Sequence, residues 1–432
     1  MSARRCRGNR CRTRGKGSGR WRRVIAQKAA VAAALCAAAG CCLLVSGWIS
    51  GDRSEETEQE SAELSGNGVS EEADQQTKQI AAICRDLYVE EAAQGSCLSL
   101  ETVRGIVDRL GESGYAAVDS ENQIDMTEAE QVQRFCSQVD SRSEGALTVI
   151  EVSYLGEFTK YDMLTRDGEV DIVKSCYRMA DGQPKGSILR YRAQWWEYTQ
   201  EGYLFFGGSC LTEDYYALYL SGTPISSVMR VLPLDERCRE LNRRYIAPIG
   251  YGRNDLFLSD WSEEDFGEID FYDLYDIFHG LKYNRYVPYR ADENAGTGAV
   301  YRIPQAEFEE VIMTYLDIDE ETLRSKTKYI PDAESYEYRP RGFFDAEYPE
   351  VPYPEVVGCR ENDDGTITLT VNAVYPKRRL SKAYAHEVVV RPLEDGGVQY
   401  VSNKILPTEG NYEPIWHVPR LTEEEWERVY GR

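Results

Sequence analysis

Apolar residues recur every three or four positions in three successive segments, a spacing that predicts amphipathic helices. The first apolar face comprises Ile80, Ile83, Cys84, Leu87 and Tyr88. The second helix is predicted to begin after the N-cap Ser99 and to end at Gly111. The third is predicted to follow Thr127, with Glu130 closing its capping box.

The apolar pattern then changes from a helical to an alternating period, which predicts β-strands. The strands are expected at residues 146–155, 157–165, 169–179, 187–198 and 202–208. Turns such as Asp167-Gly168 and Asp181-Gly182 separate neighbouring segments, and short turns of this kind join antiparallel strands. The sequence therefore predicts an α+β domain over residues 78–230, in which helices cover one face of an antiparallel meander.

A second α+β domain with an antiparallel sheet is predicted over residues 231–432. Its first helix carries the apolar face Leu234, Cys238, Leu241 and Tyr245, and another helix is predicted to begin at Pro304. Strands are expected at residues 366–375, 386–393 and 398–406, the first of them after the turn Asp363-Asp364-Gly365. Thr422 and Glu425 predict a capping box for a short closing helix.

Residues 29–49 form an uncharged run of 21 residues, long enough to cross a bilayer core as one helix. Eleven Lys and Arg residues precede this run, whereas the first acidic residue is Asp52. Basic flanks stay in the cytoplasm, so residues 1–28 are predicted to be a cytoplasmic tail and the C-terminal region to be extracytoplasmic. Residues 50–77 are acidic and poor in apolar residues, which predicts a flexible stalk.

Two alternatives for the apolar run stay open. Its Ala-rich composition is also typical of a signal peptide, with cleavage after residues 37–39. Lipidation at Cys41 is the other alternative, although the residues before it lack the usual large aliphatic side chain. The continuation into Leu43, Leu44 and Val45 favours a retained anchor in the cell membrane, with the basic tail close to anionic lipid.

Acidic residues outnumber basic ones by 73 to 50, and the net charge is −23. Because the tail is basic, the outer region is more acidic than the whole chain. Such a surface repels phosphate backbones, so we expect no nucleic-acid partner. The seven cysteines of the outer region are odd in number and include no C-x-x-C pair, which favours buried free thiols over a disulfide framework.

The motifs of several catalytic classes are missing. The chain has only His279, His386 and His417, no Gly-x-Ser-x-Gly elbow and no zincin motif after His386. His386 is instead predicted to be a partly exposed strand residue. Calcium binding by residues 361–365 is an alternative to a plain hairpin turn there. We therefore expect no cofactor and no metal, and assign no catalytic residue.

The segment 261–289 interleaves aromatic and acidic residues. Flat apolar rings beside hydrogen-bonding groups are typical of a sugar or peptide groove. The candidate binding residues are Trp261, Asp265, Tyr272, Asp273, Tyr275 and Asp276. The alternative interpretation is a Tyr-lined seam between domains with a solvated acidic edge.

The runs SLETVRGIVDRLGESGYAAVD, DMTEAEQVQRF, GTITLTVNAVY and YVSNKIL resemble a family of uncharacterised proteins. The members of that family are single-pass, membrane-anchored extracytoplasmic proteins of Gram-positive anaerobic bacteria. The resemblance covers most of the outer region and implies location and architecture, but it transfers no functional residue.

Two functions follow as hypotheses. The first is a noncatalytic cell-envelope module that binds cell-wall polymer or an envelope protein, and the missing catalytic motifs favour it. The second is a carboxylate-dependent hydrolase of envelope glycans, for which Asp265, Asp273 and Asp276 are the residues to test.

Overall fold

A computed structural model describes residues 71–92, 97–186, 188–210, 223–285, 298–348, 350–407 and 414–431. Asn67–Arg432 is one compact unit, and every described residue belongs to it. The predicted tail, the apolar run 29–49 and most of the predicted stalk lie outside the described residues. Within the described ranges, no helix has both the length and the apolar character needed to cross a membrane.

The N-terminal half contains one sheet of seven strands in the order β1-β2-β3-β4-β5-β6-β7. Its strands are β1 Ala116–Asp119, β2 Gly145–Val152, β3 Glu157–Arg166, β4 Glu169–Arg178, β5 Leu189–Tyr198, β6 Tyr203–Cys210 and β7 Thr223–Arg230. β1 pairs with β2 in parallel, and each later pair is antiparallel. The predicted meander is confirmed, and β1 and β7 extend it at its two edges.

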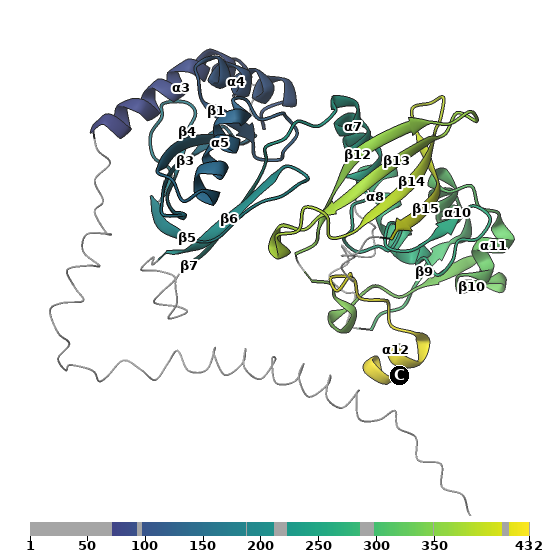
Figure 1. Cartoon of the computed structure of the whole chain (residues 1–432). Helices are drawn as coiled ribbons and strands as arrows, with labels where there is room; N and C mark the ends of the chain where they lie inside the picture. The colour runs from purple at the N-terminus through teal and green to yellow at the C-terminus, as the bar shows by residue number, and fades with distance from the viewer. Residues whose placement is uncertain are drawn as a thin grey trace, which may run out of the picture. The chain divides into compact units, whose positions relative to one another are not determined.

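Three helices pack against this sheet: α3 Glu71–Ala92, α4 Leu100–Glu112 and α5 Ala129–Asp140. Figure 1 shows α3 and α4 next to each other above the sheet, and their apolar faces share a core with Ile150 and Phe158. The three predicted helices are confirmed, but the expectation that they cover one face of the sheet is wrong. α3 and α4 pack with Ile150, whereas α5 packs with Val149, and consecutive strand residues point to opposite faces. α3 begins at Glu71, so its first turns fall within the range predicted to be stalk.

The predicted cap of α5 is wrong. Its N-cap is Glu128, in the left-handed region at φ 49°, and no side chain caps the helix. The Thr127 hydroxyl instead donates to the carbonyl of Tyr115 at 3.2 Å, and the Thr127 amide donates to Ala117 at 2.9 Å. A tertiary contact with β1 therefore replaces the predicted capping box.

The C-terminal half contains a five-stranded sheet, β12-β13-β14-β15-β8, and a three-stranded sheet, β10-β11-β9. The strands are β8 Trp261–Ser262, β9 Tyr301–Pro304, β10 Tyr329–Ile330, β11 Ser335–Tyr338, β12 Tyr353–Glu361, β13 Ile367–Val374, β14 Ala385–Pro392 and β15 Val398–Leu406. The α-helices are α7 Glu236–Leu241, α8 Phe271–Tyr283, α10 Gln305–Tyr315, α11 Glu320–Ser325 and α12 Glu423–Tyr430. A π-helical turn follows α7 at Asn242–Ile246, and 3-10 turns occur at Pro331–Ala333, Phe343–Asp345 and Pro376–Arg378.

The strands predicted in this half are confirmed as β13, β14 and β15, and the residues around Gly365 form the predicted hairpin turn. Thr422 and Glu425 form the predicted capping box of α12. His386 lies in strand β14 as predicted, but its predicted partial exposure is wrong. Its side chain is fully buried between the hydroxyl of Tyr251 at 2.8 Å and the amide oxygen of Asn403 at 2.7 Å. The mixed α+β class with antiparallel sheets is confirmed.

A buried ion pair ties the two halves together. The Arg230 guanidinium of β7 and the hydroxyl of Tyr203 in β6 both donate to Glu355 of β12, each at 2.6 Å. The side chains of Arg230 and Glu355 are each only 7% exposed. The boundary predicted at residue 230 falls between β7 and α7, and it stays a prediction because Asn67–Arg432 is one compact unit.

Candidate functional site

The first turn of α8 organises the site. Asp270 is the N-cap of the helix, and its carboxylate accepts the backbone N–H groups of Tyr272 at 2.9 Å and Asp273 at 3.1 Å. A carboxylate in this position satisfies free amides and interacts favourably with the helix dipole. Helical spacing then places Asp276 one turn after Asp273 on the same side of α8.

Asp273 forms a buried salt bridge with two arginines. The Arg341 Nε atom lies 2.9 Å from Asp273 Oδ1, and its Nη2 atom contacts Oδ2. The Nη2 atom of Arg420 lies 2.5 Å from Oδ1 of the same carboxylate. Only 1% of the Asp273 side chain and 8% of the Arg341 side chain are exposed, so water scarcely screens this interaction.

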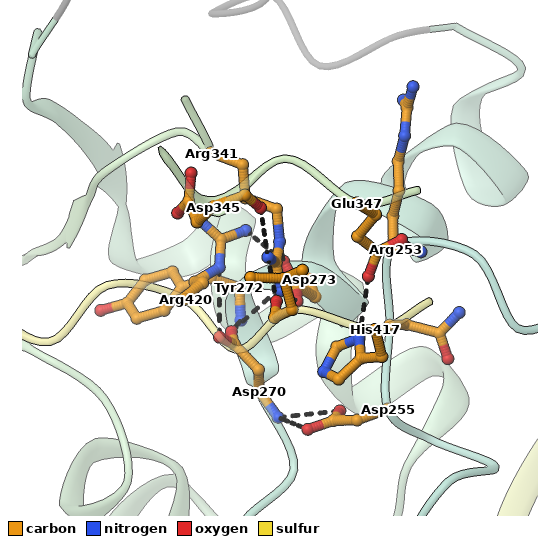
Figure 2. Close-up of polar contacts among 12 residues, drawn as sticks. Arg253, Asp255, Asp270, Tyr272, Asp273, Arg341, Asp345, Glu347, His417 and Arg420 are labelled. Atoms are coloured by element: carbon orange, nitrogen blue, oxygen red, sulfur yellow. Dashed lines mark hydrogen bonds and ion pairs between the residues drawn. The ribbon is translucent and has the colours of Figure 1, made fainter. Parts of the chain in front are cut away.

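Arg420 also joins the neighbouring acids. Its Nε atom lies 3.2 Å from Asp270 Oδ2, and its Nη2 atom lies 3.6 Å from Asp276 Oδ2. We name Asp270, Asp273, Asp276, Arg341 and Arg420 the Asp273 cluster. Figure 2 labels Asp270, Asp273, Arg341 and Arg420. The cluster contains three carboxylates and two guanidinium groups.

The acidic excess of the cluster changes the pKa of its members. Burial, together with the nearby charge of Asp273, raises the pKa of Asp270. Burial alone would lower the pKa of Arg420, but the surrounding carboxylates more than offset that effect and raise it. Asp276 has a further partner, because the Tyr338 hydroxyl donates to its carboxylate at 2.8 Å. Both arginines are therefore charged and held in place.

Asp255, Glu347 and His417 lie beside the cluster in Figure 2. The Asp255 carboxylate accepts the backbone N–H of Asp270, with both oxygens at 3.1 Å. Burial raises the pKa of Asp255 to about 6, although this hydrogen bond opposes the shift. His417 Nδ1 lies 2.8 Å from Glu347 Oε1.

A cleft of about 620 Å³ opens beside the Asp273 cluster. The wall of the cleft includes two members of the Asp273 cluster, Asp270 and Arg420. It also includes Tyr272, whose amide the Asp270 carboxylate accepts. The other lining residues are Gly267, Glu268, Ile269, Phe271, Ser325, Lys326, Lys328, Glu337, Arg339, Asp345, Leu421, Glu423 and Trp426. The cleft therefore lies between the start of α8, the segment from α11 to β11 and the start of α12.

The charges on the cleft wall are paired with one another. Lys328 Nζ lies 3.0 Å from Glu337 Oε1 and 2.5 Å from Glu423 Oε1. Arg339 Nη2 contacts the same two carboxylates, at 2.7 and 3.1 Å. These four side chains form a balanced network that links α12 to the strands β10 and β11.

The structure separates the six predicted binding residues into two groups. Tyr272 lines the cleft, and Asp273 and Asp276 lie behind it in the Asp273 cluster. Tyr275 is buried, with its hydroxyl donating to Glu307 at 2.7 Å. The indole N–H of buried Trp261 donates to the carbonyl of Leu256 at 2.7 Å, and exposed Asp265 caps a turn by accepting the Gly267 amide at 3.0 Å.

Sequence reasoning missed Arg341 and Arg420, which carry the positive charge of the site. No local pattern marks either residue, and Arg341 follows its partner Asp273 by 68 positions. The helix α8 was also missed, although Asp270 as a cap and the spacing of Phe271, Leu274 and Phe278 are helical signals.

Metal binding has no geometric support within the described ranges. There, no group of three or more His, Cys, Asp or Glu side chains is arranged to hold an ion. In the turn considered for calcium, Asp364 Oδ1 accepts the amide of Thr366 at 3.0 Å and its hydroxyl at 2.7 Å. Those contacts are typical of a hairpin turn.

The fold and the site define a mixed α+β protein with antiparallel sheets and a charged cleft beside a buried ion cluster. Residues 70–420 match the model of a family of unknown function, DUF6070, and the chain belongs to this family. No curated protein and no solved structure matches the chain. The expectation of an uncharacterised family is confirmed, whereas the membrane anchor and the bacterial group that the resemblance implies stay predictions.

Proposed function

We propose that this protein is a noncatalytic binding module of the cell envelope, anchored by residues 29–49, with the cleft beside α8 as its binding surface. The observation that carries the proposal is the Asp273 cluster. Of the three acids expected to serve a hydrolase, Asp273 and Asp276 contact arginines, and their side chains are 1% and 4% exposed. A carboxylate held in this way positions a wall of the cleft instead of transferring protons. The third, Asp265, is exposed and caps a turn by accepting the Gly267 amide.

The charge of the cleft wall indicates which ligands suit it. Lys328, Arg339, Glu337 and Glu423 neutralise one another, so the wall offers no concentrated positive charge to a polyanion. The wall carries both donors and acceptors, together with Tyr272 and Trp426. This combination suits a polar chain of low net charge, such as a wall glycan or the peptide segment of an envelope partner.

One observation favours the alternative, a carboxylate-dependent hydrolase of envelope glycans. Burial raises the pKa of Asp255 to about 6, the range in which a carboxyl group can act as a general acid. Asp255 is absent from the residues that line the cleft, and its two oxygens are already engaged by the Asp270 amide. A glycosidase also needs a second, free carboxylate across the scissile bond. Binding without turnover therefore agrees better with the geometry.

The test uses the full-length chain, solubilised in mild detergent and incubated with isolated cell wall of a Gram-positive anaerobe. Co-sedimentation and soluble fragments released from the wall are measured together. We expect co-sedimentation without release. Release of fragments would overturn the noncatalytic proposal, and a full-length chain that neither sediments nor releases fragments would overturn wall binding in favour of a protein partner.

A matched pair of variants locates the binding surface. Glu423→Gln removes one charge of the network on the cleft wall and should weaken co-sedimentation several-fold. Glu144→Gln removes an exposed carboxylate, 77% exposed against 63% for Glu423, from a surface ion pair with Arg166 and should leave binding unchanged. Equal behaviour of the two variants would show that the binding surface is elsewhere.

A further inference from the structure

An exposed apolar patch lies on the surface close to the cleft. Phe343 is 83% exposed, Phe344 54%, Tyr348 61% and Ile415 43%. The first three belong to one short segment, and the amide of Tyr348 donates to the carbonyl of Trp416 at 3.4 Å, which brings Ile415 near Tyr348. We name these four exposed side chains the Phe343 patch.

Elsewhere in the described part of the chain, exposed large apolar side chains are spread over separate elements and turns. They are Val89, Leu155, Leu164, Leu281, Val300 and Val357. Single apolar side chains of this kind are normal on a protein surface. Several that gather on one segment and its neighbour indicate a contact surface.

The patch is displayed by a turn that buried groups hold in place. Phe343–Asp345 form a 3-10 turn, in which the Asp345 carboxylate accepts the Gly342 amide at 2.5 Å. Arg341, a member of the Asp273 cluster, donates to the Asp345 carbonyl at 2.9 Å. The Phe344 ring lies 6.2 Å from the ring of Tyr430 in α12. The fold itself therefore presents the two phenylalanines to solvent.

The size of the patch limits what can cover it. At about 150–250 Å² for a whole aromatic side chain, the exposed parts of its three rings and of Ile415 offer roughly 450 Å². A stable protein interface takes about 800 Å² from each partner, so the patch alone is too small for one. Shallow insertion into a bilayer has no such threshold, because its strength grows with the apolar area buried and adds to that of any other anchor.

The chain between the predicted anchor and α3 keeps the patch near a bilayer. Residues 50–70 join the apolar run to Glu71, where α3 begins. At no more than about 3.6 Å per residue, this connection spans at most roughly 75 Å. A compact region of this length has a radius of gyration of about 20 Å, so the patch can reach the membrane but cannot diffuse away from it. Such a tether raises the effective concentration of the bilayer at the patch.

Charge is not the expected attraction. Two acidic residues that follow the turn are already paired, Glu347 with His417 at 2.8 Å and Glu350 with Lys377 at 2.9 Å. The outer region as a whole is acidic, which opposes binding to anionic headgroups. Contact between the patch and a bilayer would therefore be apolar and insensitive to salt.

We propose that the Phe343 patch rests on the outer leaflet of the bilayer that holds the anchor, with the rings of Phe343 and Phe344 inserted where headgroups meet acyl chains. Tyr348 suits the same depth, because its side chain has an apolar ring and a polar end. This contact rests on the anchor of the proposed function and adds a second, weaker hold on the same membrane. Since Asp345 also lines the cleft, the contact keeps the cleft beside the membrane surface.

The test uses the full-length chain, reconstituted into phosphatidylcholine vesicles and recovered by flotation. A photoreactive benzoyl analogue of phenylalanine replaces Phe343 or Tyr348 and, as a control, Leu164 of β3. Tyr348 and Leu164 are matched, because each is 61% exposed. After irradiation, mass spectrometry measures the lipid adducts on each peptide. We expect severalfold more adduct at Phe343 and Tyr348 than at Leu164, with no loss of yield at high salt.

A double variant tests whether the phenylalanines cause the contact. Phe343→Ser combined with Phe344→Ser changes exposed side chains, so the fold should tolerate it. With the photoreactive group at Tyr348, the double variant should lose most of its lipid adduct while it still floats with the vesicles. An unchanged yield of adduct would overturn insertion of the two rings.

Flotation and adduct formation separate this contact from the anchor. A chain that floats but gives no more adduct at Phe343 than at Leu164 overturns the contact and leaves the anchor standing. A chain that does not float overturns both together. Cross-links from Phe343 to a second copy of the chain would overturn the contact in favour of self-association, and a yield that falls at high salt would overturn its apolar character.

Discussion

The C-terminal half contributes to two buried ion clusters that differ in charge balance and in surroundings. Glu355 faces one guanidinium, that of Arg230, and accepts the Tyr203 hydroxyl, so its charges balance. The Arg230 guanidinium also lies over the Tyr203 ring, 5.2 Å from its centroid. In the Asp273 cluster, three carboxylates share two arginines, and Asp270 and Arg420 reach the cleft wall.

This difference indicates that the Arg230–Glu355 ion pair is structural, whereas the Asp273 cluster is part of a candidate site. A balanced pair enclosed by tyrosines holds two sheets together and has no surface for a ligand. An unbalanced cluster with members on a cleft wall can respond to what enters the cleft, because a ligand changes its solvation and charge. Changing each cluster separately should therefore affect stability and binding in different proportions.

The largest effect is expected from Arg341→Met. The change removes the two contacts to Asp273 and those to the carbonyls of Asp345 and Val418, which leaves three carboxylates beside Arg420 alone. Breaking a buried ion pair in this way costs about 3–5 kcal/mol of unfolding free energy. Urea denaturation measures the loss. Arg192→Met, in an exposed ion pair, should change stability little, and equal losses in both variants would refute the assignment.

A smaller loss is expected from Glu355→Gln. The amide still accepts the Tyr203 hydroxyl, but Arg230 loses its buried counter-charge, which costs about 2–3 kcal/mol. Co-sedimentation with cell wall should stay unchanged, because Glu355 lies outside the cleft lining. If the variant folds but no longer binds cell wall, the Arg230–Glu355 ion pair is not purely structural, and its assumed separation from the binding surface is wrong.

Asp255→Asn should stabilise the protein, but only at pH values at which the Asp255 carboxyl of the unmodified protein is ionised. The folded-state pKa of Asp255 is about 6, above its ordinary value of 3.8, so ionisation destabilises the fold as pH rises through this window. The variant avoids that penalty and should gain about 1–2 kcal/mol at pH 7.5, after allowing for one weakened contact to the Asp270 amide. Chemical denaturation between pH 4 and 8 measures the difference. A gain that persists at pH 4 would show that ionisation is not its cause.

The sequence predicted those parts of the fold that depend on neighbouring residues. The strands β2 to β6 and β13 to β15 are mostly joined by short connections, so alternation and turn residues are enough to locate them. The α4 cap at Ser99 is equally local, since its hydroxyl accepts the Thr102 amide at 3.2 Å.

Contacts between distant segments could not be predicted. β8 is a two-residue strand that pairs Trp261 with Asn403, and no periodicity is visible over such a length. The same limit applies to the site: the acids of α8 lie in one short segment, but Arg341 and Arg420 come from remote loops. The predicted cap at Thr127 was wrong for the same reason. The Thr127 hydroxyl donates to the carbonyl of Tyr115, a contact outside the helix that the local sequence does not indicate.

The smallest effect on stability, and the most selective effect on binding, is expected from Thr422→Ala. Thr422 caps α12: its hydroxyl accepts the Glu425 amide at 3.3 Å, while Glu425 accepts the Thr422 amide at 3.2 Å. Loss of such a cap costs about 1 kcal/mol, here confined to a short terminal helix. Hydrogen exchange should quicken within residues 423–430 while the global unfolding midpoint barely moves.

This local loosening tests whether α12 is part of the binding surface. Glu423 and Trp426 reach the cleft only if α12 is formed, and Arg339 packs over the Trp426 ring at 5.7 Å from its centroid. Wall binding by Thr422→Ala should therefore weaken although the fold is intact, the opposite of the result expected for Glu355→Gln. If both variants bind like the unmodified protein, the cleft is not the binding surface, and the Asp273 cluster is a structural tie like that of Glu355.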